Sequence, residues 1–458
     1  MKPSLPQGTR DFSAATVRKR NYIFNTIRNV FELYGFQPLE TPAMENMETL
    51  MGKYGEEGDK LIFKVLNNGL DNPAKHEQAK TDFEKILEGK NTKGITERAL
   101  RYDLTIPFAR YVAMNFGQLT LPFKRYQIQP VWRADRPQRG RYREFYQCDA
   151  DVAGSNSLIN EVELSNIYAT VFKQLGIAVQ IKINSRKILT ALAELCGGAD
   201  RMIDITIAID KLDKIGLGKV MEELQQRGLS SKQISTIEKY LTIEGNTEQK
   251  IAALQSLVGH LENGQKGIEE IQFLLNYSQL TTYYSLLIPD FTLARGLNYY
   301  TGIIYEVEAL NVQMGSIGGG GRYDDLTGLF GVPNVPGVGI SFGVDRIYDV
   351  MEELQIFPAE LQSSTKILFF HLGENESRKA YHLMQQVRNK GISAEIYHEQ
   401  VKLDKQFKYA EKKGIGHVVI LGSKELEEGT CTIKNIKTGV QHTVLSDQFA
   451  DSAYKFLE

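Results

Sequence analysis

The chain has 458 residues, of which 42% are hydrophobic and 24% charged, and its formal net charge is −2. This composition is that of an ordinary globular protein, long enough for roughly two to four domains. It excludes a disulfide scaffold, because only three cysteines occur, and a membrane span, because no run approaches about 18 apolar residues. We therefore expect a cytoplasmic protein without membrane contact. The net charge neither indicates nor excludes nucleic acid, since a local basic patch suffices.

The first third of the chain mixes helix and strand patterns. Residues 14–34 carry apolar side chains at helical spacing, and strand patterns follow at 35–42, 60–66 and 99–107. Residues 67–94 are polar and look like an excursion, to which we assign no role. Residues 123–135 and 142–152 then predict an antiparallel hairpin with arginines on and beside its turn.

The rest of the chain alternates between helical and strand-rich blocks. A helix is predicted at 158–175, and residues 186–280 are a series of amphipathic helical patterns. Strand patterns return at 286–310, and 338–354 is typical of a strand entering a helix. A helical block between two strand-rich blocks indicates an inserted domain. From residue 365, alternating strands and helices predict a small α/β domain with a mostly parallel sheet.

Five arginines lie within the eleven residues 133–143, interleaved with aromatic residues. The guanidinium group is planar, permanently charged and suited to phosphate oxygens. A solvated surface is the alternative, because most charge runs are solvated. The arginines predict a polyphosphate site only in combination with motifs elsewhere in the chain.

The stretch GSIGGGGRYDD at 315–325 places four successive glycines before an arginine and Tyr323. It is not a Walker A loop, because no GK[ST] follows. Glycines permit close approach of the backbone to a ligand, although a tight bend in a buried strand is the alternative. The tyrosine directly after the glycines favours the floor of a pocket.

Two smaller clusters carry polar groups. Arg295, Tyr299 and Tyr300 can present a cation and hydroxyl groups to one ligand, or can be a solvated arginine beside core tyrosines. Asp103 and Thr105 share one face of a predicted strand and can hold an ammonium group, with strand-end capping as the alternative. Together the motifs describe a pocket for a polyphosphate and a small polar molecule.

Taken together, these stretches closely resemble histidyl-tRNA synthetase, a class II aminoacyl-tRNA synthetase, over nearly the whole chain. GFQPLETPAM at 35–44 resembles class II motif 1, residues 132–151 resemble motif 2, and GVGISFGVDR at 337–346 resembles motif 3. ARGLNYYTG and GGGGRYD resemble two peptides peculiar to the histidyl enzyme. One position departs from the family pattern, because Asn298 stands where the family has Asp.

The resemblance implies an α+β fold. Its parts are a six-stranded antiparallel catalytic sheet flanked by helices, a helical insertion that contacts the tRNA acceptor stem, and a C-terminal α/β anticodon-binding domain. The implied ranges are 1–185 and 281–352 for the catalytic domain, 186–280 for the insertion and 365–458 for the anticodon-binding domain. Motif 1 forms a dimer interface in this class, so a homodimer is expected.

The resemblance also implies the reaction. L-Histidine is activated with ATP to histidyl-adenylate and transferred to the 3′ end of tRNA(His), with Mg²⁺ on the outer phosphates and no metal held by the protein alone. The substrate carboxylate is the nucleophile, so the protein supplies positioning and charge stabilisation. This fits the absence of histidine from 100–185 and 286–350. The alternative is a non-catalytic paralogue that regulates histidine biosynthesis or senses uncharged tRNA.

The family roles extend to individual residues of this chain. Arg133 and Arg295 are expected to be catalytic, stabilising charge on the α-phosphate. Arg141 and Arg346 are expected to bind the outer phosphates, and Phe145 to stack on the adenine, so that the ATP-binding residues are Arg133, Arg141, Phe145 and Arg346. The expected histidine-binding residues are Asp103, Thr105, Gln147, Asp151, Tyr299, Tyr300 and Tyr323.

Overall fold

The computed structural model describes residues 2–52, 54–281, 283, 286–294, 299–363 and 365–457. The chain forms two compact units, Met1–Asp11 with Arg20–Ile356 and Phe12–Lys19 with Phe357–Glu458. No helix among the described residues is long and apolar enough to cross a membrane.

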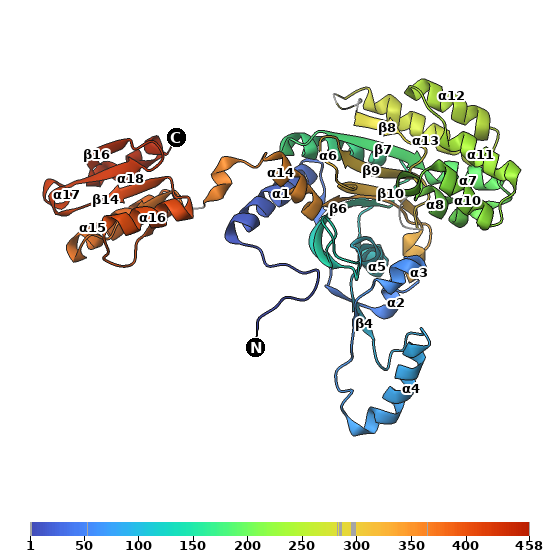
Figure 1. Cartoon of the computed structure of the whole chain (residues 1–458), viewed down its shortest axis with the longest axis horizontal. Coiled ribbons are helices and arrows are strands. Elements are labelled where there is room, and N and C mark those ends of the chain that lie inside the picture. Colours follow the sequence, from blue (N-terminus) through green and yellow to red (C-terminus); the bar gives the residue numbers. More distant parts are fainter. Residues whose placement is uncertain are drawn as a thin grey trace. The chain divides into compact units, whose positions relative to one another are not determined.

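An eight-stranded sheet forms the centre of the larger unit, in the order β1-β5-β6-β11-β10-β9-β7-β8 (Figure 1). The six middle strands pair antiparallel, and β1 and β8 each add a parallel edge strand. The predicted six-stranded antiparallel sheet is therefore confirmed, with two further strands at its edges. The strands are β1 (Gln37–Pro38), β5 (Phe123–Trp132), β6 (Glu144–Ala153), β7 (Val179–Ser185), β8 (Leu287–Pro289), β9 (Ile303–Ala309), β10 (Gly318–Asp324) and β11 (Pro336–Gly343).

Helices cover one face of this sheet with an aromatic core. They are α1 (Ala14–Leu33), α6 (Ile159–Leu175) and α14 (Val344–Leu354). Phe31 of α1 and Tyr168 of α6 both pack on Phe342 of β11, with ring centroids 5.8 and 4.8 Å away. Because side chains alternate along a strand, the residues on either side of Phe342 point to the opposite face. That opposite face is polar and holds the cavities described below.

A smaller antiparallel sheet and three helices lie beside the polar face, whereas a fourth helix projects away from it (Figure 1). The sheet has the order β2-β4-β3, and its strands are short. The elements are β2 (Met44–Asn46), α2 (Met47–Leu50), α3 (Gly55–Lys60), β3 (Lys64–Val65), α4 (His76–Leu87), β4 (Arg98–Leu100) and α5 (Thr105–Asn115). Helix α4 lies within the polar excursion at 67–94.

The strand predicted at 99–107 is wrong beyond Leu100. Thr105 is the first residue of α5, and Asp103 precedes that helix, so the two do not share a strand face. The physical reason is the side chain of Asp103, whose Oδ1 accepts a hydrogen bond from the Ile106 N–H at 3.2 Å. A helix begins with amide groups that lack backbone partners, and a carboxylate that accepts from one of them favours a helix start.

The predicted run of helices after β7 is confirmed. Seven α-helices follow one another in the described chain, and they pack at the β7–β8 end of the sheet within the same compact unit (Figure 1). Buried Glu270 joins the block to the sheet by accepting from the Ser185 hydroxyl at 2.8 Å. The helices are α7 (Arg186–Leu195), α8 (Met202–Ile209), α9 (Leu212–Ile215), α10 (Leu217–Gln226), α11 (Ser231–Leu241), α12 (Thr247–Val258) and α13 (Glu262–Ser278).

The smaller unit contains a five-stranded sheet in the order β13-β12-β14-β15-β16. The first three strands are parallel, as predicted, whereas β15 and β16 add an antiparallel hairpin that was not predicted. The elements are β12 (Ile367–Phe369), α15 (Glu374–Asn389), β13 (Ala394–Ile396), α16 (Leu403–Lys413), β14 (His417–Ile420), α17 (Ser423–Glu428), β15 (Thr430–Asn435), β16 (Gln441–Leu445) and α18 (Ser446–Ser452).

Candidate active site

Two adjoining cavities lie on the polar face of the eight-stranded sheet. The large cavity has a volume of about 470 Å³ and the small cavity about 50 Å³. They share six lining residues, so a molecule in one cavity can touch a molecule in the other. The shared residues are Arg133, Gln147, Tyr300, Gly319, Gly320 and Ser341.

Strand alternation builds the floor of the small cavity. Gln147, Asp149 and Asp151 occupy alternate positions of β6 and therefore point to one face. The register of the sheet places Ser341 of β11 opposite Asp149. The hydroxyl group of Ser341 on β11 and the carboxyl group of Asp149 on β6 therefore occupy neighbouring positions across the two strands.

Glycines make room for the bulky groups of this floor. A Cβ atom on Gly339 would lie 1.9 Å from Asp151 Oδ1, and one on Gly321 would lie 2.9 Å from the Tyr300 ring. These separations are far below van der Waals contact, so any side chain there would displace the acid or the tyrosine. The absence of side chains at Gly321 and Gly339 therefore makes room for other side chains of the protein. Gly319 and Gly320, in contrast, line both cavities.

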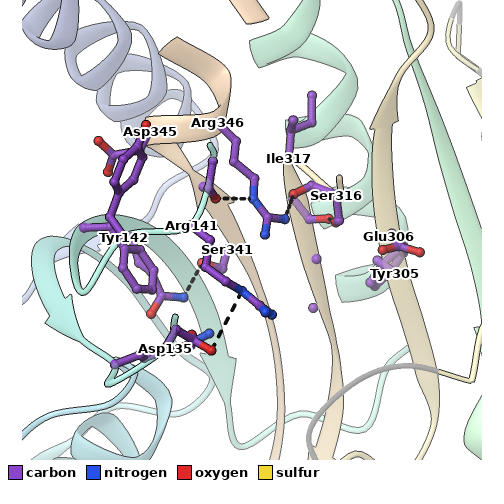
Figure 2. Close-up of a pocket in the computed structure, with 18 of the residues that line it drawn as sticks. Asp135, Arg141, Tyr142, Tyr305, Glu306, Ser316, Ile317, Ser341, Asp345 and Arg346 are labelled. Atoms are coloured by element: carbon purple, nitrogen blue, oxygen red, sulfur yellow. Dashed lines mark hydrogen bonds and ion pairs between the residues drawn. The ribbon is translucent and has the colours of Figure 1, made fainter. Parts of the chain in front are cut away.

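The large cavity is lined by Arg133, Arg141, Phe145 and Arg346, the four residues expected to bind ATP. Figure 2 shows Arg346 held in place by two backbone carbonyls. Its Nε donates to the Gly140 oxygen at 2.8 Å and its Nη1 to the Ser316 oxygen at 2.6 Å. Burial lowers the pKa of Arg346, and the positive charges of Arg141 and Arg133 lower it further. Such mutual repulsion is relieved by a polyanion.

Arg133 lies at the wall shared by the two cavities. Its Nε donates to the Tyr102 oxygen at 3.1 Å, and its guanidinium carbon lies 4.2 Å from the Tyr102 ring centroid and 5.2 Å from that of Phe145. These contacts fix the planar group while leaving further N–H donors for a ligand. Arg133 can therefore contact a molecule in the large cavity and a molecule in the small cavity at the point where the two meet.

The small cavity is lined by all seven of the expected histidine-binding residues, Asp103, Thr105, Gln147, Asp151, Tyr299, Tyr300 and Tyr323. Asp103 is 2% exposed, and burial raises its pKa. It accepts hydrogen bonds from the hydroxyl groups of Tyr54 at 2.9 Å and Tyr299 at 3.4 Å. A charged carboxylate in so dry a place favours a cationic ligand.

Asp151 is held between a cation and a tyrosine. Its Oδ2 lies 2.9 Å from the Arg125 guanidinium, and its Oδ1 accepts from the Tyr323 hydroxyl at 2.5 Å. Burial raises the pKa of Asp151, and Arg125 opposes the rise. Arg125 is fully buried and was not predicted. Its signal was available, because Arg125 and Gln127 alternate with Tyr126 and Ile128 along β5 as a polar strand face.

The arginine of the glycine-rich peptide has a different role from its tyrosine. Tyr323 lines the small cavity, but Arg322 points to the helical face and forms a buried ion pair with Glu161 of α6. Its Nη2 donates to Glu161 Oε2 at 2.8 Å. Successive side chains of a strand point to opposite faces, which explains why Arg322 and Tyr323 lie on different sides of the sheet. Arg322 therefore links β10 to α6 and lines neither cavity.

Other cavity residues were missed by sequence reasoning. Asp149 and Ser341 line the small cavity, and Asp345 lines the large one. Asp345 forms ion pairs with Arg10 and with Arg20, the latter at 2.5 Å, and so connects the N-terminal segment to the site. Ser341 carries no sequence signal, because the pairing of β11 with β6 joins residues about 190 positions apart.

Two residues singled out from the sequence, Arg295 and Asn298, lie outside the described residues. Among the described residues, no cluster of three or more His, Cys, Asp or Glu side chains could hold a metal ion. The described residues that line the two cavities include arginines, carboxylates and hydroxyl groups.

Comparison with known proteins identifies the same architecture. Residues 76–347 match the family model described as histidyl-tRNA synthetase, and residues 366–453 match an anticodon binding domain. A histidine–tRNA ligase of Bacteroides fragilis is 52% identical over 456 residues, covering 99% of each chain. The crystal structure of a histidyl-tRNA synthetase from Nostoc sp. PCC 7120 is 30% identical, with a TM-score of 0.82 over 100% of each chain.

A more distant structure shares the fold alone. It is described as an ATP phosphoribosyltransferase regulatory subunit/histidyl-tRNA synthetase from Bacillus halodurans C, and is 19% identical with a TM-score of 0.71 over 89% of this chain and 97% of its own. The family match exceeds half of the chain, and the match to the ligase from Bacteroides fragilis spans nearly all of it. The chain therefore belongs to the histidyl-tRNA synthetase family, with its class II catalytic fold and a C-terminal anticodon-binding domain.

Proposed function

We propose that this chain activates L-histidine with ATP in its two joined cavities and transfers it to the 3′ end of tRNA(His), as a histidine–tRNA ligase. The observation that carries the proposal is the division of the lining residues. The large cavity gathers arginines that suit a polyphosphate, and the small cavity gathers carboxylates and tyrosines that suit a small cation with polar ring atoms.

The wall between the cavities defines the chemistry. The histidine carboxylate attacks the α-phosphate there, which forms the acyl–phosphate bond and expels diphosphate. Arg133 lies at that wall and meets the negative charge that develops on the α-phosphate. Arg141 and Arg346 hold the outer phosphates, and Phe145 stacks on the adenine. Arg295 is proposed as a second catalytic arginine on the family resemblance alone.

The small cavity selects the amino acid. Asp103 and Thr105 hold the ammonium group, and Gln147, Asp151, Tyr299, Tyr300 and Tyr323 surround the rest of the molecule. A site whose buried groups need hydrogen-bond partners rejects an apolar mimic by about 10⁴–10⁵, because those groups would be left unpaired.

Magnesium fits the large cavity as a companion of the nucleotide. Mg²⁺ usually keeps several waters and is held by one or two carboxylates together with substrate phosphates. Asp135 and Glu306 line the large cavity and are suitable carboxylates. When bound, the ion neutralises charge on the outer phosphates.

Histidine-dependent exchange of labelled diphosphate into ATP tests the proposal directly. We expect exchange with histidine and none without it, followed by charging of tRNA(His). A non-catalytic paralogue is the second candidate, and it binds histidine or tRNA without exchange. The arginines of the large cavity favour the enzyme, since a protein that only binds histidine has no need of them. Binding of histidine or of tRNA(His) without exchange supports the paralogue, and absence of exchange together with absence of binding to either molecule excludes both candidates.

The assembly and the location are part of the same proposal. The motif 1 resemblance at residues 35–44 supports an isologous homodimer, and Met44 in this segment is a hydrophobic residue that is 47% exposed. Sedimentation at several concentrations tests the dimer.

The three cysteines, Cys148, Cys196 and Cys431, are free and buried, which suits the reducing cytoplasm where tRNA is charged.

A further inference from the structure

Tyr142 of the β5–β6 turn is held from two sides by residues that line neither cavity. The guanidinium carbon of Arg10 lies 3.2 Å from the centroid of the Tyr142 ring. At the other end of the ring, Asp349 Oδ2 accepts a hydrogen bond from the Tyr142 hydroxyl at 3.3 Å. Tyr142 lines the large cavity, whereas Arg10 and Asp349 line neither that cavity nor the small one. Tyr142 therefore connects both residues to the large cavity.

Two acids on one face of α14 contact the hairpin of β5 and β6. Asp345 and Asp349 are four residues apart, so they lie on the same face of the helix. Asp345 Oδ2 accepts a hydrogen bond from the Tyr146 N–H at 3.3 Å, while Asp349 contacts Tyr142. The helix thus holds the hairpin at two points, one on the turn and one near the start of β6.

Each of these two points is next to a residue that is expected to contact ATP. Arg141 directly precedes Tyr142, and Phe145 directly precedes Tyr146. Both Arg141 and Phe145 line the large cavity. Consecutive Cα atoms are only about 3.8 Å apart, so a shift of Tyr142 moves Arg141 with it. The position of the Arg141 guanidinium group therefore depends on contacts that are made outside the cavity.

Arg10 joins the acids of α14 to the turn. Its guanidinium group forms an ion pair with Asp345. Burial raises the pKa of Asp349, and the positive charge of Arg10 opposes this rise. The same planar group stacks on the Tyr142 ring, a contact that the compact ammonium group of a lysine does not reproduce. The N-terminal segment and α14 therefore meet at this tyrosine.

We propose that Arg10 and Asp349 are positioning residues for ATP, which hold Tyr142 and thereby the neighbouring Arg141 in place at the large cavity. This inference rests on the proposed function and adds to it two residues that line neither cavity. ATP binding should depend on both residues, whereas histidine binding in the small cavity should not. Because the two act through the same tyrosine, their effects should not be independent.

The test measures the KM for ATP and the KM for histidine in diphosphate exchange. The proteins are the full-length wild type, Arg10→Ala, Asp349→Ala and the double variant. We expect each single variant to raise the KM for ATP by roughly three- to tenfold, the usual effect of losing one cation–π contact or one hydrogen bond. The KM for histidine should be unchanged. The double variant should raise the KM for ATP by less than the product of the two single effects, because both residues act through Tyr142.

Two conservative variants separate positioning from general destabilisation, and they decide the test if an alanine variant does not fold. Arg10→Lys keeps the cation but loses the stacked plane, and Asp349→Asn keeps an acceptor oxygen. Each should raise the KM for ATP, but by less than the alanine variant at the same position.

Glu353→Gln is the matched control. Glu353 lies one helical turn beyond Asp349 and also contacts the turn, through Arg139, but its side chain is 42% exposed and lines neither cavity. Exposed ion pairs contribute little, so both KM values should match those of the wild type.

Three results would overturn the inference. The first is an unchanged KM for ATP in either alanine variant. The second is an equal rise in both KM values, since that indicates a general loosening of the site. The third is a double variant whose effect equals the product of the single effects, since the two residues then act by separate routes. Failure of the wild type to exchange diphosphate with histidine would instead count against the proposed function.

Discussion

Arg133 is the described side chain whose loss should affect activation most. It lines both cavities and is held against Tyr102 and Phe145. Arg133→Ala should lower diphosphate exchange by about 10²–10³, the usual effect of removing a donor that stabilises transition-state charge. Arg139→Ala is the control, because Arg139 belongs to the same turn but is 62% exposed and pairs with Glu353. Exchange by Arg133→Ala within tenfold of the wild type would remove this residue from the mechanism.

The buried acid Asp149 makes the stability of the protein depend on pH. Its pKa is about 7 in the fold and about 3.9 in an unfolded chain, so the folded state binds more protons between these values. The contribution of Asp149 to the free energy of unfolding therefore falls as the pH rises from about 4 to 7. The charged groups around it are Arg125, Asp151 and Asp103, which belong to three different segments.

Asp149→Asn should remove this dependence. We expect its urea midpoint to exceed that of the wild type at pH 8 and to approach it at pH 5. The reason is that the amide stays neutral, while the carboxylate is charged and desolvated above its pKa. Equal differences between the two proteins at both pH values would show that Asp149 does not titrate in this range.

At the scale of elements, the N-terminal segment supports the turn between β5 and β6. The Arg143 N–H donates to the Gly8 oxygen at 2.9 Å, and the Arg10 guanidinium lies 3.2 Å from the Tyr142 ring centroid. Arg10 also pairs with Asp345 at the start of α14. The segment thus connects two elements that line the large cavity.

Gly8→Ala should weaken ATP binding more than histidine binding. Gly8 has a φ of 82°, and a Cβ there would lie 2.7 Å from Arg143 Cγ, so the segment or the Arg143 side chain of the turn must shift. We expect the KM for ATP to rise by roughly tenfold, since a left-handed conformation alone costs about 1–2 kcal/mol. Gly35→Ala is the control, because Gly35 has a φ of 79° with no atom within 4 Å. Equal changes in both KM values would contradict a specific role at the large cavity.

The sequence predicted strands correctly where polar and apolar residues alternate regularly. The β5–β6 hairpin followed from alternating side chains, and the same alternation could have identified Arg125 and Asp149 as members of the polar face. Ser341 could not be placed, because its distance from Asp149 depends on long-range register. Thr105 was wrongly assigned to a strand because a short alternation of polar and apolar residues is compatible with a strand and with the first turn of a helix. The hydrogen bond that Asp103 accepts from the Ile106 N–H favours the helix.

At the scale of the whole molecule, the chain divides near residue 357, close to the predicted boundary at 365. The second unit contains the five-stranded sheet and matches an anticodon binding domain. It also includes Phe12–Lys19, where Arg18 Nε donates to the Leu361 oxygen at 2.7 Å. A truncation placed after residue 364 keeps this contact and removes the sheet.

Deletion of residues 365–458 should spare diphosphate exchange and severely impair tRNA charging. Both cavities are lined entirely by residues of the larger unit, whereas RNA specificity usually comes from unpaired bases read by a separate surface. Circular dichroism and sedimentation must first show that the truncated chain folds and keeps the association state of the full-length protein. Normal charging by a folded truncation would show that the second unit does not recognise the anticodon.

The shared wall of the two cavities has a consequence for inhibition. A compound that places an amino-acid mimic in the small cavity and a nucleotide mimic in the large one, joined by a stable linkage at Arg133, contacts both at once. Once one half is bound, the other half is confined near its site at an effective concentration in about the millimolar range for a short linker. The joined compound should therefore bind far more tightly than either half, and it should release slowly because both halves must leave together.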